Sequence, residues 1–128
     1  MHIDRLDHLV LTVRDLDATV QFYTNVLGMH VITFGADKRK ALTFDAQKIN
    51  LHVAGREFEP KAHHPTPGSA DLCFITATPL AEVLTHLARH QITMEEGPVR
   101  RTGATGPLES IYIRDPDANL IEISNVLL

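Results

Sequence analysis

The first half of the chain combines short apolar runs with one amphipathic stretch. His8 to Val13 is a nearly continuous apolar run, which is typical of a strand buried on both faces. Asp15 can cap a helix whose apolar residues recur at helical spacing as far as Gly28, a residue favoured just beyond a helix end. Three further strands are expected over residues 29–35, 41–46 and 48–53. The first half is therefore predicted to fold as a strand, a helix and three strands.

The second half repeats this order of elements after a connector. Residues 55–69 contain three prolines, two glycines and several charges, so they are expected to join elements rather than form one. An apolar strand is expected from Asp71 to Thr76, and Thr78 is expected to cap a helix that has Pro79 at its first position. Further strands are expected at 92–95, 110–114 and 119–124, with a loop at 100–107. The two halves are therefore predicted to be structural repeats.

The repeat places polar residues at equivalent positions of the two halves. His8 and Asp71 begin the first strand of each half, and Asn50 and Glu122 lie in the last strands. If the two halves pack around a pseudo-two-fold axis, equivalent positions face each other. One imidazole and two carboxylates, from His8, Asp71 and Glu122, suit a divalent metal with open positions, which would act as a Lewis acid. His52, on the same strand face as Asn50, is a possible fourth donor.

The metal predicted from this set is one that accepts oxygen ligands. Oxygen-rich ligation favours Mn²⁺, Fe²⁺ or Mg²⁺, with Zn²⁺ or Ni²⁺ as alternatives. Each residue also has a structural interpretation: Asp71 could end the connector, and Glu122 could pair with an arginine such as Arg114. Taken singly, Asp71 and His52 favour that interpretation, whereas the repeat favours the ligand interpretation for His8 and Glu122. Cys73, inside an apolar strand, is expected to be a buried and inert thiol.

Composition and charge narrow the class of protein. The 128 residues suit one domain or two small repeats, and with 44% apolar and 22% charged residues the chain is not disordered. No apolar run approaches the roughly 20 residues that cross a bilayer, and the start lacks a secretory signal. A single cysteine suits the cytoplasm, and a net charge of −4 without a basic stripe argues against nucleic acid. We therefore expect a cytoplasmic protein with no nucleic-acid or membrane partner.

Four segments carry a resemblance to a known family: the opening strand Asp7–Val13, the pairs Phe22-Tyr23 and Leu27-Gly28, and the closing run Ile113–Glu122. They resemble the vicinal oxygen chelate superfamily, which includes glyoxalase I, fosfomycin-resistance proteins, extradiol dioxygenases and bleomycin-resistance proteins. Within the superfamily the chain is most similar to small glyoxalase-domain proteins called virulence-associated or dioxygenase-related. The resemblance implies an α+β fold of two βαβββ modules, a bowl-shaped mixed sheet and a metal at its centre.

The resemblance also assigns positions. His8 matches the metal histidine of the first strand and Glu122 the metal glutamate of the last. Asp71 stands where many relatives have a second histidine, and Asn50 stands where glyoxalase I has a glutamate. These departures weaken an extradiol dioxygenase assignment and a glyoxalase I assignment, respectively.

Substrate contacts follow from the same comparison. Ser110 and Tyr112 match hydroxyls that hold the substrate phosphonate in fosfomycin-resistance relatives, and Thr12 and Arg114 are expected to line the bowl with them. Ala118 replaces the usual glycine of the closing turn, which would cost about 1 kcal/mol if that position needs a positive φ.

Three classes of function fit these residues. The first is a metal-dependent enzyme acting on a small oxygen-rich substrate, in which His52 or Glu122 moves a proton. Lyase, isomerase, epoxide-opening and ring-cleaving chemistry all stay open. The second is a metal-free protein that sequesters a ligand, and a third is a dimeric scaffold with a relict site. Relatives that exchange modules between subunits imply a homodimer with two-fold symmetry, with or without such exchange.

Overall fold

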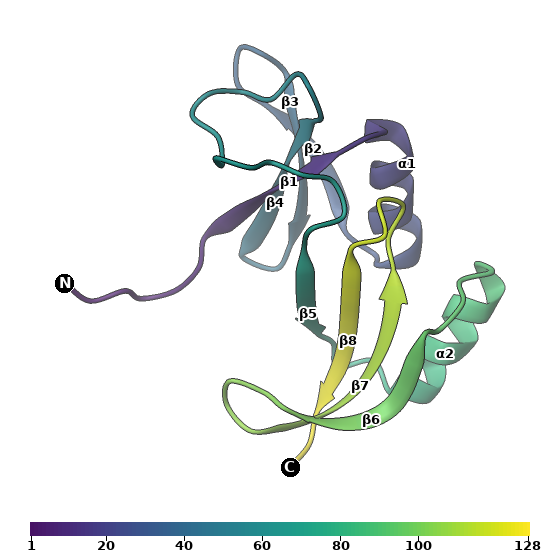
Figure 1. The fold of residues 1–128 in the computed structure, drawn as a ribbon. Helices are drawn as coiled ribbons and strands as arrows, with labels where there is room; N and C mark the ends of the chain where they lie inside the picture. Colours follow the sequence, from purple (N-terminus) through teal and green to yellow (C-terminus); the bar gives the residue numbers. More distant parts are fainter. The chain divides into compact units, whose positions relative to one another are not determined.

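Each half of the chain forms a four-stranded mixed sheet with one helical segment in the computed structural model, which describes residues 1–128 (Figure 1). The halves form two separate units, Met1–Gly68 and Ser69–Leu128. Both units have the order strand, helix, three strands, so the predicted α+β class with two βαβββ modules is confirmed. No helix in either unit has the length and apolar character needed to span a membrane.

Unit one is built around the parallel pair of its first and last strands. Its elements are β1 (His8–Val13), α1 (Leu16–Gln21) with the π-helical turn η1 (Phe22–Val26), β2 (His30–Phe34), β3 (Arg39–Phe44) and β4 (Gln47–Val53). The strand order is β1-β4-β3-β2, with β1 parallel to β4 and the other pairs antiparallel. The alternating side chains give an apolar face, which includes Leu11, Leu42 and Ile49, and a polar face, which includes His8 and His52.

Unit two repeats this topology. Its elements are β5 (Asp71–Ile75), α2 (Leu80–Arg89), β6 (Glu96–Thr102), β7 (Pro107–Arg114) and β8 (Leu120–Val126), in the order β5-β8-β7-β6. One face of this sheet carries buried isoleucines such as Ile111 and Ile121, and the α2 side chains Leu80, Val83 and Leu87 are buried as well. The opposite face carries Tyr112 and Glu122, which are paired across β7 and β8.

The two helices are capped differently. The Asp15 side chain accepts a hydrogen bond from the Ala18 N–H at 3.1 Å, as predicted. The prediction that Thr78 caps the second helix is wrong: the Asn125 Oδ1 accepts from the Leu80 N–H at 2.9 Å. Pro79 is itself the first residue outside the helix and has no side-chain donor or acceptor, so the β8 residue Asn125 supplies the cap instead.

The predicted strand at 92–95 is also misplaced. The strand starts at Glu96 and continues to Thr102, so residues 100–102 belong to β6 and not to a loop. Gly97 and Pro98 interrupt the register between Glu96 and Val99. This irregularity breaks the alternation of side chains by which a strand is recognised in a sequence.

A turn between β7 and β8 joins the ends of the inner strands. Ala118 has a φ of 66°, so the position does need the left-handed conformation that glycine adopts without strain. The buried Asp115 accepts hydrogen bonds from the Asp117 and Asn119 N–H groups, each at 2.9 Å. Asn119 in turn accepts from the Ala70 N–H at 2.8 Å, which fixes the start of β5 beside β8.

Candidate functional site

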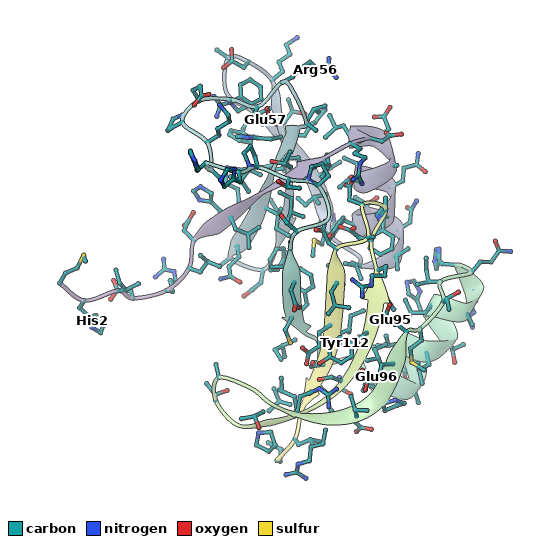
Figure 2. All side chains as sticks on the ribbon, viewed as in Figure 1. His2, Arg56, Glu57, Glu95, Glu96 and Tyr112 are labelled. Atoms are coloured by element: carbon teal, nitrogen blue, oxygen red, sulfur yellow. The ribbon has the colours of Figure 1, made fainter.

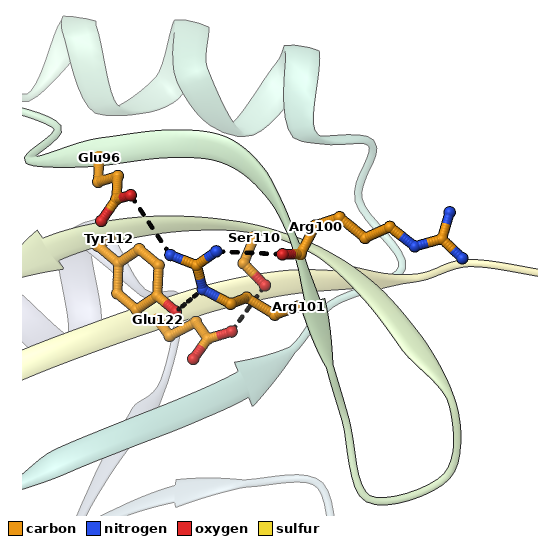
Figure 3. Close-up of polar contacts among 6 residues, drawn as sticks. All are labelled: Glu96, Arg100, Arg101, Ser110, Tyr112 and Glu122. Atoms are coloured by element: carbon orange, nitrogen blue, oxygen red, sulfur yellow. Dashed lines mark hydrogen bonds and ion pairs between the residues drawn. The ribbon is translucent and has the colours of Figure 1, made fainter.

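A carboxylate and two serine hydroxyls form a cluster on the polar face of unit two. Glu122 lies on β8, and Ser110 on β7 is the register partner of Ser124 on β8. Both serines are fully buried, at 0% exposure, whereas Glu122 is half-buried. Ser110 Oγ donates to Glu122 Oε2 at 2.7 Å (Figure 3). Ser124 Oγ lies 3.3 Å from the same oxygen, and the two serine oxygens are 2.7 Å apart. The second oxygen, Oε1, receives neither hydroxyl.

Tyr112 and Arg101 lie next to this cluster (Figure 3). Arg101 Nε donates to Tyr112 Oη at 2.9 Å, and its Nη2 lies 3.3 Å from Glu96 Oε1. Burial, and then the neighbouring Glu122 charge, raise the pKa of Tyr112 against the lowering effect of Arg101, so the phenol keeps its proton at neutral pH. Sequence reasoning missed Arg101 because it assigned residues 100–107 to a loop. The alternation of Val99 and Arg101 is the only signal that could have placed it on this face.

Arg114 is paired with a different carboxylate from the one considered in the sequence. Its Nε and Nη2 donate to the two oxygens of Glu95 at 3.1 and 2.9 Å, and its Nη1 donates to the Ala118 carbonyl at 3.2 Å (Figure 2 labels Glu95). The structural alternative that Glu122 pairs with Arg114 is therefore wrong. Glu122 has no ion pair, because both nearby arginines bind other acids.

The β5 residues of this face are exposed. Asp71 begins the strand, and its side chain makes no hydrogen bond or ion pair. Cys73, the register partner of Glu122, is exposed and not buried as predicted, because it lies on the polar face of β5, which is an edge strand. Its sulfur is 3.4 Å from Ser124 Oγ, and the partial burial of that sulfur raises the pKa of the thiol.

In unit one, His8 is oriented by its neighbour in the chain. His8 Nδ1 lies 2.8 Å from Asp7 Oδ2, and this hydrogen bond lowers the pKa of Asp7. Because a carboxylate can only accept, Nδ1 donates, and neutral His8 then keeps its lone pair on Nε2. Metal-binding histidines commonly have this arrangement with a carboxylate. The His8 side chain is 44% exposed, so Nε2 can be reached.

The other candidates of unit one lie on the same face as His8. His52 is only 6% exposed, and its ring packs against Phe58 with the centroids 5.6 Å apart. Burial, followed by the charge of Arg39, lowers the pKa of His52, so the imidazole is neutral at pH 7. Thr12 is buried opposite His52 in the β1–β4 register, and the buried Asn50 Oδ1 has no hydrogen-bond partner.

The donor set fits a divalent metal in its chemistry. Within neither unit does a group of three or more His, Cys, Asp or Glu side chains lie together as a metal site. The predicted ligands divide between the units, His8 in one and Asp71 with Glu122 in the other, so the complete set stays a prediction. An imidazole with a free Nε2, an unpaired Asp71 carboxylate and a Glu122 oxygen free of serine hydroxyls are suitable ligands.

Comparison with known proteins decides the family. Residues 5–123 match the family model of the glyoxalase/bleomycin resistance protein/dioxygenase superfamily. The chain belongs to this superfamily. Among superfamily members it is 63% identical over 124 residues to the virulence protein STM3117 of Salmonella typhimurium, with 97% of this chain and 85% of that protein aligned. The crystal structure of STM3117 has a TM-score of 0.96 at 61% identity and covers 99% of this chain and 100% of that one.

A second relative carries the superfamily in its name. The glyoxalase domain-containing protein RDO1 of Mycosarcoma maydis is 57% identical over 125 residues. The alignment covers 98% of this chain and 70% of the relative. The resemblance noted in the sequence is thus confirmed at the level of the superfamily.

Proposed function

We propose that this superfamily member is a metal-dependent enzyme that acts on a small oxygen-rich substrate, with His8, Asp71 and Glu122 as the metal ligands. The observation that carries the proposal is Glu122. It is a half-buried carboxylate with hydroxyl donors on one oxygen and no cationic partner. Since a buried charge is costly unless it is paired, a bound cation accounts for this residue better than a structural role does.

The oxygen-rich donor set favours Mn²⁺, Fe²⁺ or Mg²⁺, with Zn²⁺ and Ni²⁺ as alternatives. When bound, such a metal supplies Lewis-acid stabilisation of negative charge on a substrate oxygen. His52 is neutral at pH 7 and is the proposed proton acceptor, through a ring nitrogen, and Glu122 Oε1 is the second candidate for that role. Lyase, isomerase, epoxide-opening and ring-cleaving reactions are all compatible with these residues.

The polar face of unit one favours a substrate with anionic oxygens. The Lys48 ammonium lies 4.0 Å from the Phe34 ring centroid and makes no ion pair. Lys48 is also the register partner of His8 on the neighbouring strand. The strand positions on this face hold basic side chains and no carboxylate; the basic ones are His8, His30, Arg39, Lys48 and His52. Thr12, Tyr112 and Arg114 are the proposed substrate-binding residues.

A second candidate function is a metal-free protein that sequesters a ligand. Two residues favour it: Asp71 stands where many relatives have a second histidine, and Asn50 stands where glyoxalase I has a glutamate. In either case we propose a cytoplasmic homodimer, and gel filtration at micromolar concentration tests the dimer. A stable monomer would contradict that part.

Metal analysis of protein purified without chelator separates the two functions. The wild type is expected to retain a divalent metal, and His8→Ala and Glu122→Ala are expected to lose it. Glu109→Ala and His90→Ala are matched controls that remove a carboxylate of β7 and a histidine at the end of α2, and both should retain the metal. Absence of metal from the wild type, together with intact small-molecule binding, would favour sequestration.

A further inference from the structure

We propose that Ser110 and Ser124 are positioning residues that orient the Glu122 carboxylate for metal binding through Oε1. The inference rests on the proposed function, because it assigns both serines to a metal ligand. It replaces the substrate contact that the sequence predicted for Ser110. A fully buried hydroxyl has no surface to offer a substrate, whereas it can hold a neighbouring carboxylate.

The strand register brings the three side chains together. Ser110 is opposite Ser124 across β7 and β8, and Glu122 is two residues before Ser124 on the same face of β8. The serine oxygens are 2.7 Å apart, and both lie within hydrogen-bonding distance of Glu122 Oε2. The two hydroxyls therefore act on one carboxylate oxygen.

The order of donors follows from counting protons. An ionised Glu122 can only accept, so Ser110 must spend its single proton on Oε2 at 2.7 Å. The 2.7 Å contact between the serines then needs the Ser124 proton, because the Ser110 proton is already used. Ser124 thus donates to Ser110 in preference to the longer 3.3 Å contact with Oε2. The hydroxyls form a directed chain that ends on the carboxylate.

This chain has a consequence for metal binding. Because Ser110 holds Oε2, the carboxylate cannot rotate freely, and Glu122 presents Oε1 as the oxygen that carries no serine hydroxyl. Hydrogen bonds that fix a ligand in this way typically change metal affinity by about 10- to 100-fold. Loss of the Ser110 hydroxyl should therefore weaken metal binding by at least about 10-fold. Loss of Ser124 should weaken it less, since Ser124 acts through Ser110.

The test measures the affinity of the full chain for Mn²⁺, with electron paramagnetic resonance giving the concentration of the free ion. The variants are Ser110→Ala, Ser124→Ala, Glu122→Ala and the double variant Ser110→Ala/Glu122→Ala. Thr19→Val is the matched control, because it removes another fully buried hydroxyl, one that has no hydrogen-bond partner and lies on α1. A thermal melt of each variant checks that it is folded.

Four outcomes decide the inference. A loss of about 10-fold or more in Ser110→Ala, with Thr19→Val unchanged and no further loss when Ser110→Ala is added to Glu122→Ala, supports it. Wild-type affinity in Ser110→Ala overturns it and leaves the proposed function intact, provided that Glu122→Ala still weakens binding. A further loss in the double variant also overturns it, because Ser110 would then act independently of Glu122. If the wild type does not bind Mn²⁺, or binds it as well as Glu122→Ala does, the inference and the proposed function both fail.

Discussion

Gly97 on β6 packs closely against the backbone of Ser110, the serine that holds Glu122. A Cβ atom at this position would lie 2.5 Å from the Ser110 carbonyl oxygen, 2.9 Å from Ile111 Cα and 3.2 Å from Ile111 Cγ2. Two of these atoms belong to the β7 backbone, which cannot give way as a flexible side chain can. Gly97→Ala is therefore expected to push β6 away from β7 and to disturb Ser110.

The cost of Gly97→Ala has two parts. The φ of Gly97 is 111°, a conformation that costs a residue with a Cβ about 1–2 kcal/mol. Forcing an extra methyl group against packed atoms typically costs a further 1–3 kcal/mol or so. The expected loss in the free energy of unfolding is the sum of the two, about 2–5 kcal/mol.

Urea unfolding of Gly97→Ala and Gly106→Ala measures the two parts separately. Gly106 also has a positive φ, 147°, but a Cβ there meets nothing within 4 Å, so Gly106→Ala should show the backbone cost alone. We expect Gly97→Ala to be the less stable variant by roughly 1–3 kcal/mol. Equal stabilities, within about 0.5 kcal/mol, would refute the reasoning that packing against Ser110 requires glycine.

Three further predictions follow from single residues. Ala118→Gly should stabilise the protein by roughly 0.5–1 kcal/mol in the same urea assay, because removing about 1–2 kcal/mol of left-handed strain outweighs the added chain entropy of glycine. Unchanged stability would contradict it. Burial lowers the pKa of His52 below 6.5, so the unfolded chain binds the proton more tightly. The stability that neutral His52 contributes is complete above about pH 6.5 and is lost as the pH falls toward the folded-state pKa. In thermal melts between pH 7 and 5, His52→Gln should therefore lose less stability on acidification than the wild type does. Asn119→Ala should cost roughly 1–3 kcal/mol by thermal melting, because the Ala70 N–H loses its acceptor, and a loss under about 0.5 kcal/mol would show that water replaces it.

The sequence predicted most of the fold because apolar runs mark most of the strands. The apolar runs at β1 and β5, and the apolar residues that recur at every second position in β4 and at the start of β8, are each enough to identify a strand. Strand β6 could not be predicted in the same way, since Gly97 and Pro98 break its alternation and it pairs only with β7. The cap of α2 was missed for a different reason: Asn125 is 45 residues from Leu80, and only the folded sheet brings them together.

The candidate site was predicted in part. The repeat identified Glu122 as a carboxylate inside an apolar strand, and the structure adds what holds it. The contact between Ser110 and Glu122 depends on the register of β7 against β8, which a one-residue shift would have destroyed and which the sequence alone does not fix. Arg114 was expected to line the bowl, and the structure adds its pairing with Glu95, which no spacing in the sequence indicates.

The most direct measurement is anomalous X-ray scattering from a crystal of the wild-type protein grown with Mn²⁺. The proposed function predicts a peak beside Glu122 Oε1, with Asp71 and His8 Nε2, from the same chain or from a second copy, completing the ligands. A crystal that shows no manganese at Glu122, or shows it bound only by other residues, would contradict the proposal.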